Sequence, residues 1–169
     1  RWYDAIIAET ARVGLMVNFH GSVIPRGWAR THPHVISYEG IRGAEYYVFY
    51  GQPLTAVHNV IQPFTRNVVG SMDYTPVTYS APQRETSDAH ELALGVVYES
   101  GITHFADAPD QYRARPLAAS FVAELPATWD EVRLLDGHPD AHATIARRAT
   151  TSATRRRRDV RPSAVRTPP

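Results

Sequence analysis

Hydrophobic and polar positions along the chain predict an alternation of helices and strands. The run RWYDAIIAETARVG, residues 1–14, has the spacing of an amphipathic helix, and Gly14 marks its expected end. Residues 85–100 predict a second, strongly amphipathic helix. Short apolar runs that end in polar residues are typical of buried strands, and three occur, at LMVNFH (15–20), SMDYTP (71–76) and ITHFAD (102–107).

The segments between these elements are less regular. Residues 21–37 have no clear period, and we expect a long loop there. The other expectations are a loop leading into a short helix over 38–51, a helix broken at Pro63 over 56–69, one or two helices over 109–125, and antiparallel strands at 129–137 and 142–148. Alternation of helices and strands predicts an α/β fold with a parallel sheet covered by helices.

The three predicted strands share one property, because each ends in polar residues. In a (β/α)8 TIM barrel such strand ends form the catalytic face. Three strands cannot close a barrel, so we expect a partial (β/α)8 barrel, roughly its C-terminal half. An amphipathic run that begins at Arg1 without a cap also leads us to expect that the natural chain starts earlier.

Composition narrows the function classes. The chain has 169 residues, of which 43% are hydrophobic, as in a globular domain. It has no cysteine, which excludes disulfides and thiolate metal ligands. No apolar run has the length of a membrane span, so we expect no membrane partner. No signal peptide is apparent, and the sequence alone assigns no compartment.

Charge is distributed unevenly along the chain. Residues 1–146 carry 10 arginines and 16 acidic residues, whereas residues 147–169 carry 8 arginines and one aspartate. The tail at 149–169 has no apolar period, and we expect it to be disordered. Its RRRR run is a candidate for nucleic-acid binding. The acidic body and the abrupt loss of pattern instead favour a solvated tail or translation out of frame.

Two groups of histidines are candidates for chemistry. His32 and His34 flank Pro33 in an extended segment without an obvious third ligand, so we interpret them as loop residues rather than a metal site. His20 ends a predicted buried strand, where it can contact a substrate hydroxyl or hold a charge. A core histidine paired with the backbone is the alternative, and the sequence leaves both open.

The stretch YEGIRGAEY, residues 38–46, places Glu39 and Glu45 six positions apart. In a helix, their side chains would be offset by about 120° and would not share a face. In a loop, Gly40 and Gly43 permit bends that bring both carboxylates together. Such a pair suits a Ca²⁺ ligand beside a proton donor. From spacing alone, an exposed acidic turn is the favoured interpretation.

A longer series of motifs resembles glycoside hydrolase family 97. The motifs run in the same order, FHG (19–21), PRGWARTHP (25–33), YEGIRGAEY (38–46), PFTRNVVGSMDYTP (63–76), ELALGVVYESGITHFADAPDQY (91–112) and LPATWDEVRLLDG (125–137). The family comprises α-glucosidases and α-galactosidases with a (β/α)8 catalytic barrel. The resemblance covers roughly residues 1–148 and implies two regions, the C-terminal part of that barrel at 1–124 and the start of a C-terminal β-domain at 125–148. The Arg-rich tail at 149–169 does not match the family and stays a region expected to be disordered from its composition.

The resemblance also implies roles for individual residues. Glu45 falls at the general acid, Glu39 at a Ca²⁺ ligand, with Glu45 a second contact to the ion, and His20 at a substrate-contacting histidine. Inverting members carry Glu after that histidine. Gly21 stands there instead, as in the retaining, α-galactosidase-like subgroup, whose nucleophile is an Asp on an earlier strand.

Several consequences follow if the resemblance holds. The nucleophile would lie before Arg1, and because a retaining glycosidase needs two carboxyl groups about 5–5.5 Å apart, the chain alone is expected to be inactive. We expect an oligosaccharide or α-glycoside substrate and a secreted or periplasmic parent protein. Arg30 and Arg42 are candidates for orienting the sugar, or for ordinary ion pairs. Asp73 and Asp107 either face the site or cap turns.

A different class of function stays open beside the enzyme. The alternative is a non-catalytic module, either a carbohydrate-binding remnant or a nucleic-acid binder that uses the arginine tail. Salt-dependent DNA affinity that vanishes on deletion of 149–169 would favour the second form.

Overall fold

The computed structural model of the chain describes residues 1–50, 53–150 and 161–166. The elements in order are α1 (Trp2–Val13), β1 (Val17–Phe19), α2 (Trp28–Thr31), β2 (Val35–Tyr38), α3 (Tyr46–Tyr50), α4 (Ala56–Ile61), the 3-10 turns η1 (Gln62–Phe64) and η2 (Asn67–Val69), α5 (Asp88–Val97), α6 (Pro109–Arg113), α7 (Pro116–Ala123), β3 (Glu131–His138), β4 (His142–Arg148) and β5 (Arg161–Arg166). The prediction of a fold that combines helices with sheets is therefore confirmed.

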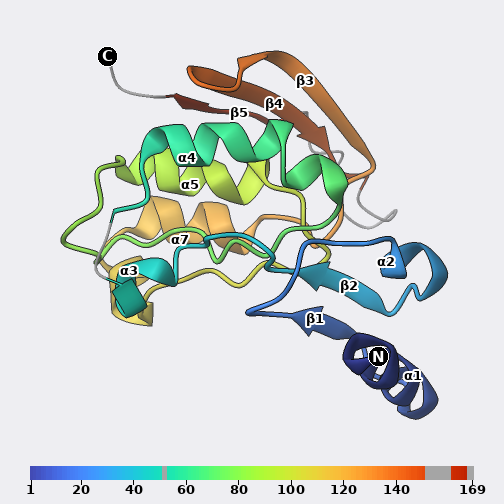
Figure 1. The fold of residues 1–169 in the computed structure, drawn as a ribbon. Helices are drawn as coiled ribbons and strands as arrows, with labels where there is room; N and C mark the ends of the chain where they lie inside the picture. The colour runs from blue at the N-terminus through green and yellow to red at the C-terminus, as the bar shows by residue number, and fades with distance from the viewer. Residues whose placement is uncertain (51–52, 151–160, 167–169) are drawn as a thin grey trace.

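Two sheets of different kinds lie in different parts of the molecule (Figure 1). β1 and β2 pair in parallel, with Val17 opposite Val35 and Phe19 opposite Tyr38. β3, β4 and β5 form an antiparallel sheet that packs over α4 and α5. The parallel pair lies between this helical layer and α1, which holds the N-terminal end of the chain.

The long helices follow their sequence signals. α1 ends at Gly14, whose left-handed φ of 72° lets its N–H reach back to the carbonyls of the last turn. α5 begins after Ser87, whose hydroxyl accepts a hydrogen bond from the backbone N–H of His90. The predicted break at Pro63 is confirmed, because the helix gives way to the 3-10 turn η1 at that point. These helices bury one face each.

Three predictions, one of a loop and two of strands, differ from the structure. The predicted loop at 21–37 contains α2 and most of β2, which starts at Val35; the β-branched pair of Val35 and Ile36 carried that signal. The predicted strand at 102–107 is not a strand, because the backbone N–H of His104 donates to the Asp73 carboxylate instead of a strand carbonyl. At 71–76 only Met72 pairs, through a parallel bridge to Tyr38.

The arginine tail also needs correction where the structure describes it. Residues 161–166 form β5, which pairs with β4 along its length, so disorder is wrong for this segment. Val165 is 1% exposed and packs in the core with Ala143 and Leu94, which offsets the ordering cost of the strand. The RRRR run at 155–158 lies outside the described residues. The predicted antiparallel strands at 129–137 and 142–148 are confirmed.

The apolar core has two parts. The larger one joins α4 and α5 to β4 and β5, around Val60, Leu94, Ile145 and Val165. The smaller one fills the space between α1 and the parallel pair, around Ile7. Within the described residues, no helix combines the length and apolar character needed to cross a membrane.

Candidate active site at the strand ends

Four neighbouring chain segments end at the same place. β1 is followed by His20, β2 by Glu39, the bridge residue Met72 by Asp73, and the segment after α5 reaches His104. Parallel alignment brings their carboxyl ends together, and the N–H of Met72 donates to the Glu99 carbonyl at 2.8 Å, which places the fourth segment alongside the third. We call His20, Glu39, Glu45, Asp73 and His104 the strand-end cluster.

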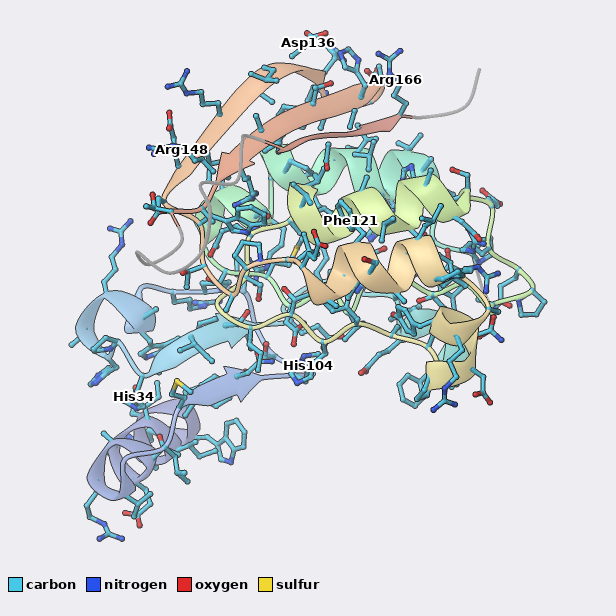
Figure 2. The ribbon with its side chains drawn as sticks, turned by 180° about the vertical axis from the view of Figure 1, so that it is seen from behind. His34, His104, Phe121, Asp136, Arg148 and Arg166 are labelled. Carbon is cyan, nitrogen blue, oxygen red and sulfur yellow. The ribbon has the colours of Figure 1, made fainter. Side chains whose placement is uncertain are left out.

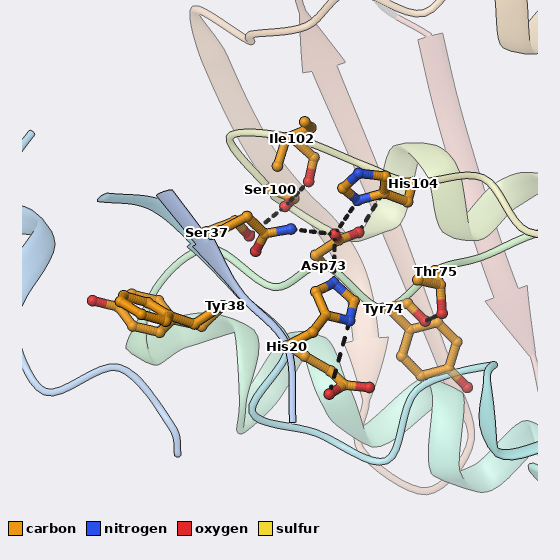
Figure 3. Close-up of polar contacts among 12 residues, drawn as sticks. His20, Ser37, Tyr38, Asp73, Tyr74, Thr75, Ser100, Ile102 and His104 are labelled. Carbon is orange, nitrogen blue, oxygen red and sulfur yellow. Dashed lines mark hydrogen bonds and ion pairs between the residues drawn. The ribbon is translucent and has the colours of Figure 1, made fainter. Parts of the chain in front are cut away.

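Asp73 is the buried centre of the strand-end cluster (Figure 3). Its Oδ2 accepts hydrogen bonds from Asn18 Nδ2 at 2.6 Å, His20 Nε2 at 2.8 Å and His104 Nδ1 at 2.5 Å. Its Oδ1 accepts from the backbone N–H of His104 at 3.0 Å. Burial raises the pKa of this carboxyl, but the hydrogen bonds outweigh it and hold the pKa below its usual value.

Glu39 and Glu45 converge because the segment between them is a loop. Gly40 has a φ of 46°, which glycine tolerates best. Gly43 lies so close to the Tyr74 carbonyl that a Cβ there would be 2.8 Å from its oxygen. One ligand atom from each of His20, Glu39 and Glu45 lies within 4.8 Å of the others. The loop interpretation is therefore confirmed, and the helical one is wrong.

The donor atoms of this group fit a hard divalent cation. Two carboxylates held this close repel each other, and a cation between them removes that cost. Glu39 Oε2 already accepts the Gly21 N–H at 2.7 Å, which fixes the carboxylate while leaving its other oxygen available. Calcium takes carboxylate oxygens, whereas the His20 nitrogen suits softer metals. Glu39 and Glu45 are thus the residues that fit calcium.

Arg66 holds the backbone next to the cluster in place. This guanidinium is 5% exposed, and it donates to five backbone carbonyls, those of Tyr38, Glu39, Gly40, Gly70 and Ser71, at 2.9–3.1 Å. Burial lowers the pKa of Arg66 to about 10, and Glu99 opposes this shift. The same side chain therefore fixes the backbone that carries Glu39 and the backbone that leads to Asp73.

Backbone strain gathers next to the cluster. Thr75, Val77 and Asp107 have φ angles of 54°, 74° and 80°, although none is glycine. Such conformations cost of order 1–3 kcal/mol each and persist where surrounding structure imposes them, often at functional sites. The Pro76 carbonyl between the first two accepts the Ala106 N–H at 2.8 Å, which ties both strained segments together.

Other candidates from the sequence lie apart from the cluster or serve the fold. Arg30 is exposed on α2, which comes before β2, whereas Glu39 follows that strand. His34 bonds the Ile7 carbonyl at 3.0 Å and so anchors α1. Arg42 stacks over the Tyr46 ring at 4.3 Å. Asp107 accepts hydrogen bonds from the N–H and the hydroxyl of Ser80, so its carboxylate serves to hold two loop segments together.

Sequence reasoning left some functional residues unassigned. The sequence left it open whether Asp73 faces the site or caps a turn. Because the structure buries Asp73 among four donors, it belongs to the cluster. His104 was overlooked, although its place near the end of a predicted strand was a usable signal. Asn18 and Arg66 carried no signal, since Asn18 acts through a contact 55 residues along the chain and Arg66 through contacts up to 28 residues away.

Comparisons with known proteins agree on one family. The sequence profile of "Glycoside hydrolase 97" matches residues 1–41. A probable retaining α-galactosidase of Streptomyces bingchenggensis is 53% identical over 149 residues, which is 87% of this chain and 23% of that protein. The retaining α-galactosidase of Bacteroides thetaiotaomicron is 34% identical over 151 residues, 82% of this chain and 23% of that protein.

Solved structures give the same result. A glycoside hydrolase family 97 enzyme from Pseudoalteromonas sp. strain K8, in complex with acarbose, superposes with a TM-score of 0.89 at 30% identity, over 98% of this chain and 26% of that one. A β-arabinopyranosidase superposes with a TM-score of 0.79 at 31% identity, over 87% of this chain and 25% of that one. The chain thus spans about a quarter of the length of the relatives it matches, and it belongs to glycoside hydrolase family 97.

Proposed function

We propose that this chain contributes the acid and calcium part of a retaining α-galactosidase-type active site. The observation that carries the proposal is the convergence of His20, Glu39 and Glu45, with ligand atoms within 4.8 Å, at the ends of two parallel strands. In a (β/α)8 barrel, catalytic groups occupy this position. We accordingly assign the parallel segments to a partial barrel and β3 to β5 to the start of a following β-domain.

Glu45 acts as the general acid in this proposal. Its side chain is exposed at the start of α3, so it can reach the oxygen of a glycosidic bond, whereas Asp73 is buried and fully engaged by donors. Protonation of the leaving oxygen by a positioned carboxyl group contributes about 10²–10⁴-fold to the rate. Glu39, which is less exposed and held by the Gly21 N–H, serves as the metal ligand.

Calcium would be held by Glu39 and Glu45, and when bound it supplies a fixed positive charge beside the leaving oxygen. The chain's own residues set the rest of the arrangement. Arg66 holds the Glu39 backbone, and the Ala44 N–H bonds the Tyr74 carbonyl at 2.9 Å, which fixes the approach to Glu45. Rigid placement of this kind keeps an acid within reach of its substrate.

The retaining assignment is supported by position 21. Gly21 has a φ of 59° and offers only a backbone N–H, so no carboxylate base comes from this position. Retention requires a second carboxyl group about 5–5.5 Å from the acid to act as the nucleophile. In the described part of the chain, Glu39 and Asp73 have other tasks. We therefore propose that the nucleophile belongs to the family's catalytic domain outside these residues, and that the chain by itself does not hydrolyse glycosides.

The experiment compares leaving groups in the complete catalytic domain that contains this chain. Glu45→Gln should slow hydrolysis of an alkyl α-galactoside by about 10²–10⁴-fold and that of a dinitrophenyl α-galactoside far less, because the second leaving group needs no proton. Glu124→Gln, an exposed glutamate after α7, is the control. Equal losses on both substrates would refute the acid role. Turnover by the 169-residue chain alone would refute the external nucleophile.

A further inference from the structure

Glu91 is a buried acid outside the strand-end cluster. It lies in the first turn of α5 and is 1% exposed. Its Oε1 accepts a hydrogen bond from the Thr86 hydroxyl at 2.5 Å, and its Oε2 accepts one from the backbone N–H of Thr78 at 3.2 Å. Burial raises the pKa of Glu91, and these hydrogen bonds oppose the shift. Because an unpartnered carboxyl group is costly to bury, the position of Glu91 depends on both donors.

The N–H that Glu91 accepts belongs to a strained loop that follows Asp73. Thr75 and Val77 in this loop have φ angles of 54° and 74°, and the two residues and Thr78 after them are buried. β-Branched residues adopt positive φ only where the surrounding structure imposes it. The hydrogen bond to Glu91 is one such contact, at the residue directly after Val77.

The start of the same loop fixes the approach to Glu45. The Tyr74 carbonyl accepts hydrogen bonds from the Ala44 N–H at 2.9 Å and from the Thr75 hydroxyl at 2.6 Å. A Cβ on Gly43 would lie 2.8 Å from the same carbonyl oxygen, so the two backbones are in close contact. A shift of the Tyr74 carbonyl therefore moves the residue that comes directly before Glu45.

The helix that carries Glu91 is firmly placed. α5 buries Leu94, Val96 and Val97 and packs against β4 and β5. Figure 2 shows the helical layer between Asp136 and Arg166 on the antiparallel sheet and the segment that carries His104. Glu91 thus connects a helix of the core to the loop beside the strand-end cluster.

We propose that Glu91 is a positioning residue for Glu45. Its carboxylate holds the strained loop at Thr78, and the loop holds the backbone before Glu45 through the Tyr74 carbonyl. The inference rests on the acid role proposed above for Glu45. A displacement of about 1 Å, caused at a distance, can cost about 10²-fold in rate. Since the donor is a backbone N–H, the loop needs an acceptor at residue 91 rather than a charge.

The first test compares leaving groups in the complete catalytic domain. Glu91→Met keeps the length of the side chain but removes the acceptor. We expect kcat for an alkyl α-galactoside to fall by about 10²-fold, with KM unchanged and a far smaller loss on a dinitrophenyl α-galactoside, because only the first leaving group needs a proton from Glu45. Glu91→Gln retains a carbonyl oxygen for the Thr78 N–H and should restore most of the rate.

Two further variants separate positioning from general damage to the fold. Leu94→Ala removes core packing from the same helix and should affect both substrates alike. Thr86→Val removes only the hydroxyl on the other oxygen of Glu91, and it should show the selectivity of Glu91→Met in smaller measure even if that variant does not fold. Equal losses on both substrates in the Glu91 and Thr86 variants, or a Glu91→Gln enzyme as slow as Glu91→Met, would overturn the proposal.

The second test needs no catalysis. Amide hydrogen exchange of the complete catalytic domain, followed by mass spectrometry, should be about tenfold faster or more over residues 42–46 and 76–80 in Glu91→Met, with α1 unchanged. Unchanged exchange over 42–46 would overturn the connection from Glu91 to Glu45. If Glu45→Gln slows both galactosides equally, the proposed acid role fails, whereas the exchange rates still decide whether Glu91 holds this backbone.

Discussion

Histidine–carboxylate pairs occur in both halves of this molecule, with opposite surroundings. In the parallel region, His20 and His104 share Asp73, which is 0% exposed. On the antiparallel sheet, His142 pairs with Asp136 and His138 with Asp140, whose carboxylates are 75% and 72% exposed. The residue types are the same, but Asp73 is buried and shared by two histidines, whereas each exposed carboxylate pairs with one histidine.

That difference determines what each pair can do. A buried carboxylate depends on its donors, so it fixes their orientation and loses much if they leave. An exposed pair is solvated in any case, and its members are free to separate. The comparison teaches that residue pairing alone does not identify a site, and that the proposed site rests in addition on burial of the shared acceptor at the ends of parallel strands.

Arg66→Met should have the largest effect on stability. The variant leaves five backbone carbonyls without their donor in a buried place, and we expect the free energy of unfolding to fall by about 3–5 kcal/mol. Urea denaturation followed by circular dichroism measures this. Arg133→Met, which removes an exposed arginine of β3, is the control and should leave the midpoint unchanged. If both variants lowered the free energy of unfolding equally, the proposed difference between the buried and the exposed region would be wrong.

Asp73→Asn comes next. The amide keeps one acceptor but adds two hydrogens that face the His20 and His104 donors, and we expect unfolding to cost about 2–3 kcal/mol less than in the parent. Asp136→Asn on the antiparallel sheet should change nothing measurable in the same denaturation experiment. A stable Asp73→Asn variant would show that the histidines find other partners.

Lowering the pH should weaken the fold through a histidine outside the cluster. Burial lowers the pKa of His90 to about 4, and Asn59 Nδ2 lies 3.1 Å from its Nε2. The folded state keeps His90 neutral while the unfolded state takes up a proton near pH 6.5, so stability falls as the pH drops from 6.5 towards 4. Thermal melts across this range measure the loss, and His90→Gln should flatten the curve. An unchanged slope would contradict the buried neutral form.

The smallest effect should come from the exposed pair at the tip of the β3–β4 hairpin. Asp140→Asn removes the partner of His138. Since both side chains are mostly exposed, we expect no measurable change in the denaturation midpoint of the chain or in the hydrolytic activity of the complete catalytic domain. A clear loss in either quantity would mean that exposed pairs in this protein matter as much as Asp73.

The sequence predicts the regular elements well and the site only in part. α1, α5 and the β3–β4 hairpin follow from local periodicity and caps, since nearby residues determine them. The presence of β2 and the absence of a strand at 102–107 depend on which other segments lie next to them in the fold. Glu39 and Glu45 were found together through a family resemblance, because their convergence needs Gly43 to approach the Tyr74 carbonyl, a contact no spacing reveals.

The measurement that tests the central claim most directly is a calcium titration of the chain by calorimetry. The account predicts one calcium per chain in the parent, with affinity reduced at least tenfold by Glu39→Gln and by Glu45→Gln, because each removes a carboxylate from the ion. Glu124→Gln should bind like the parent. Calcium binding that both site variants retain, or no binding by the parent, would contradict a metal site at the strand ends.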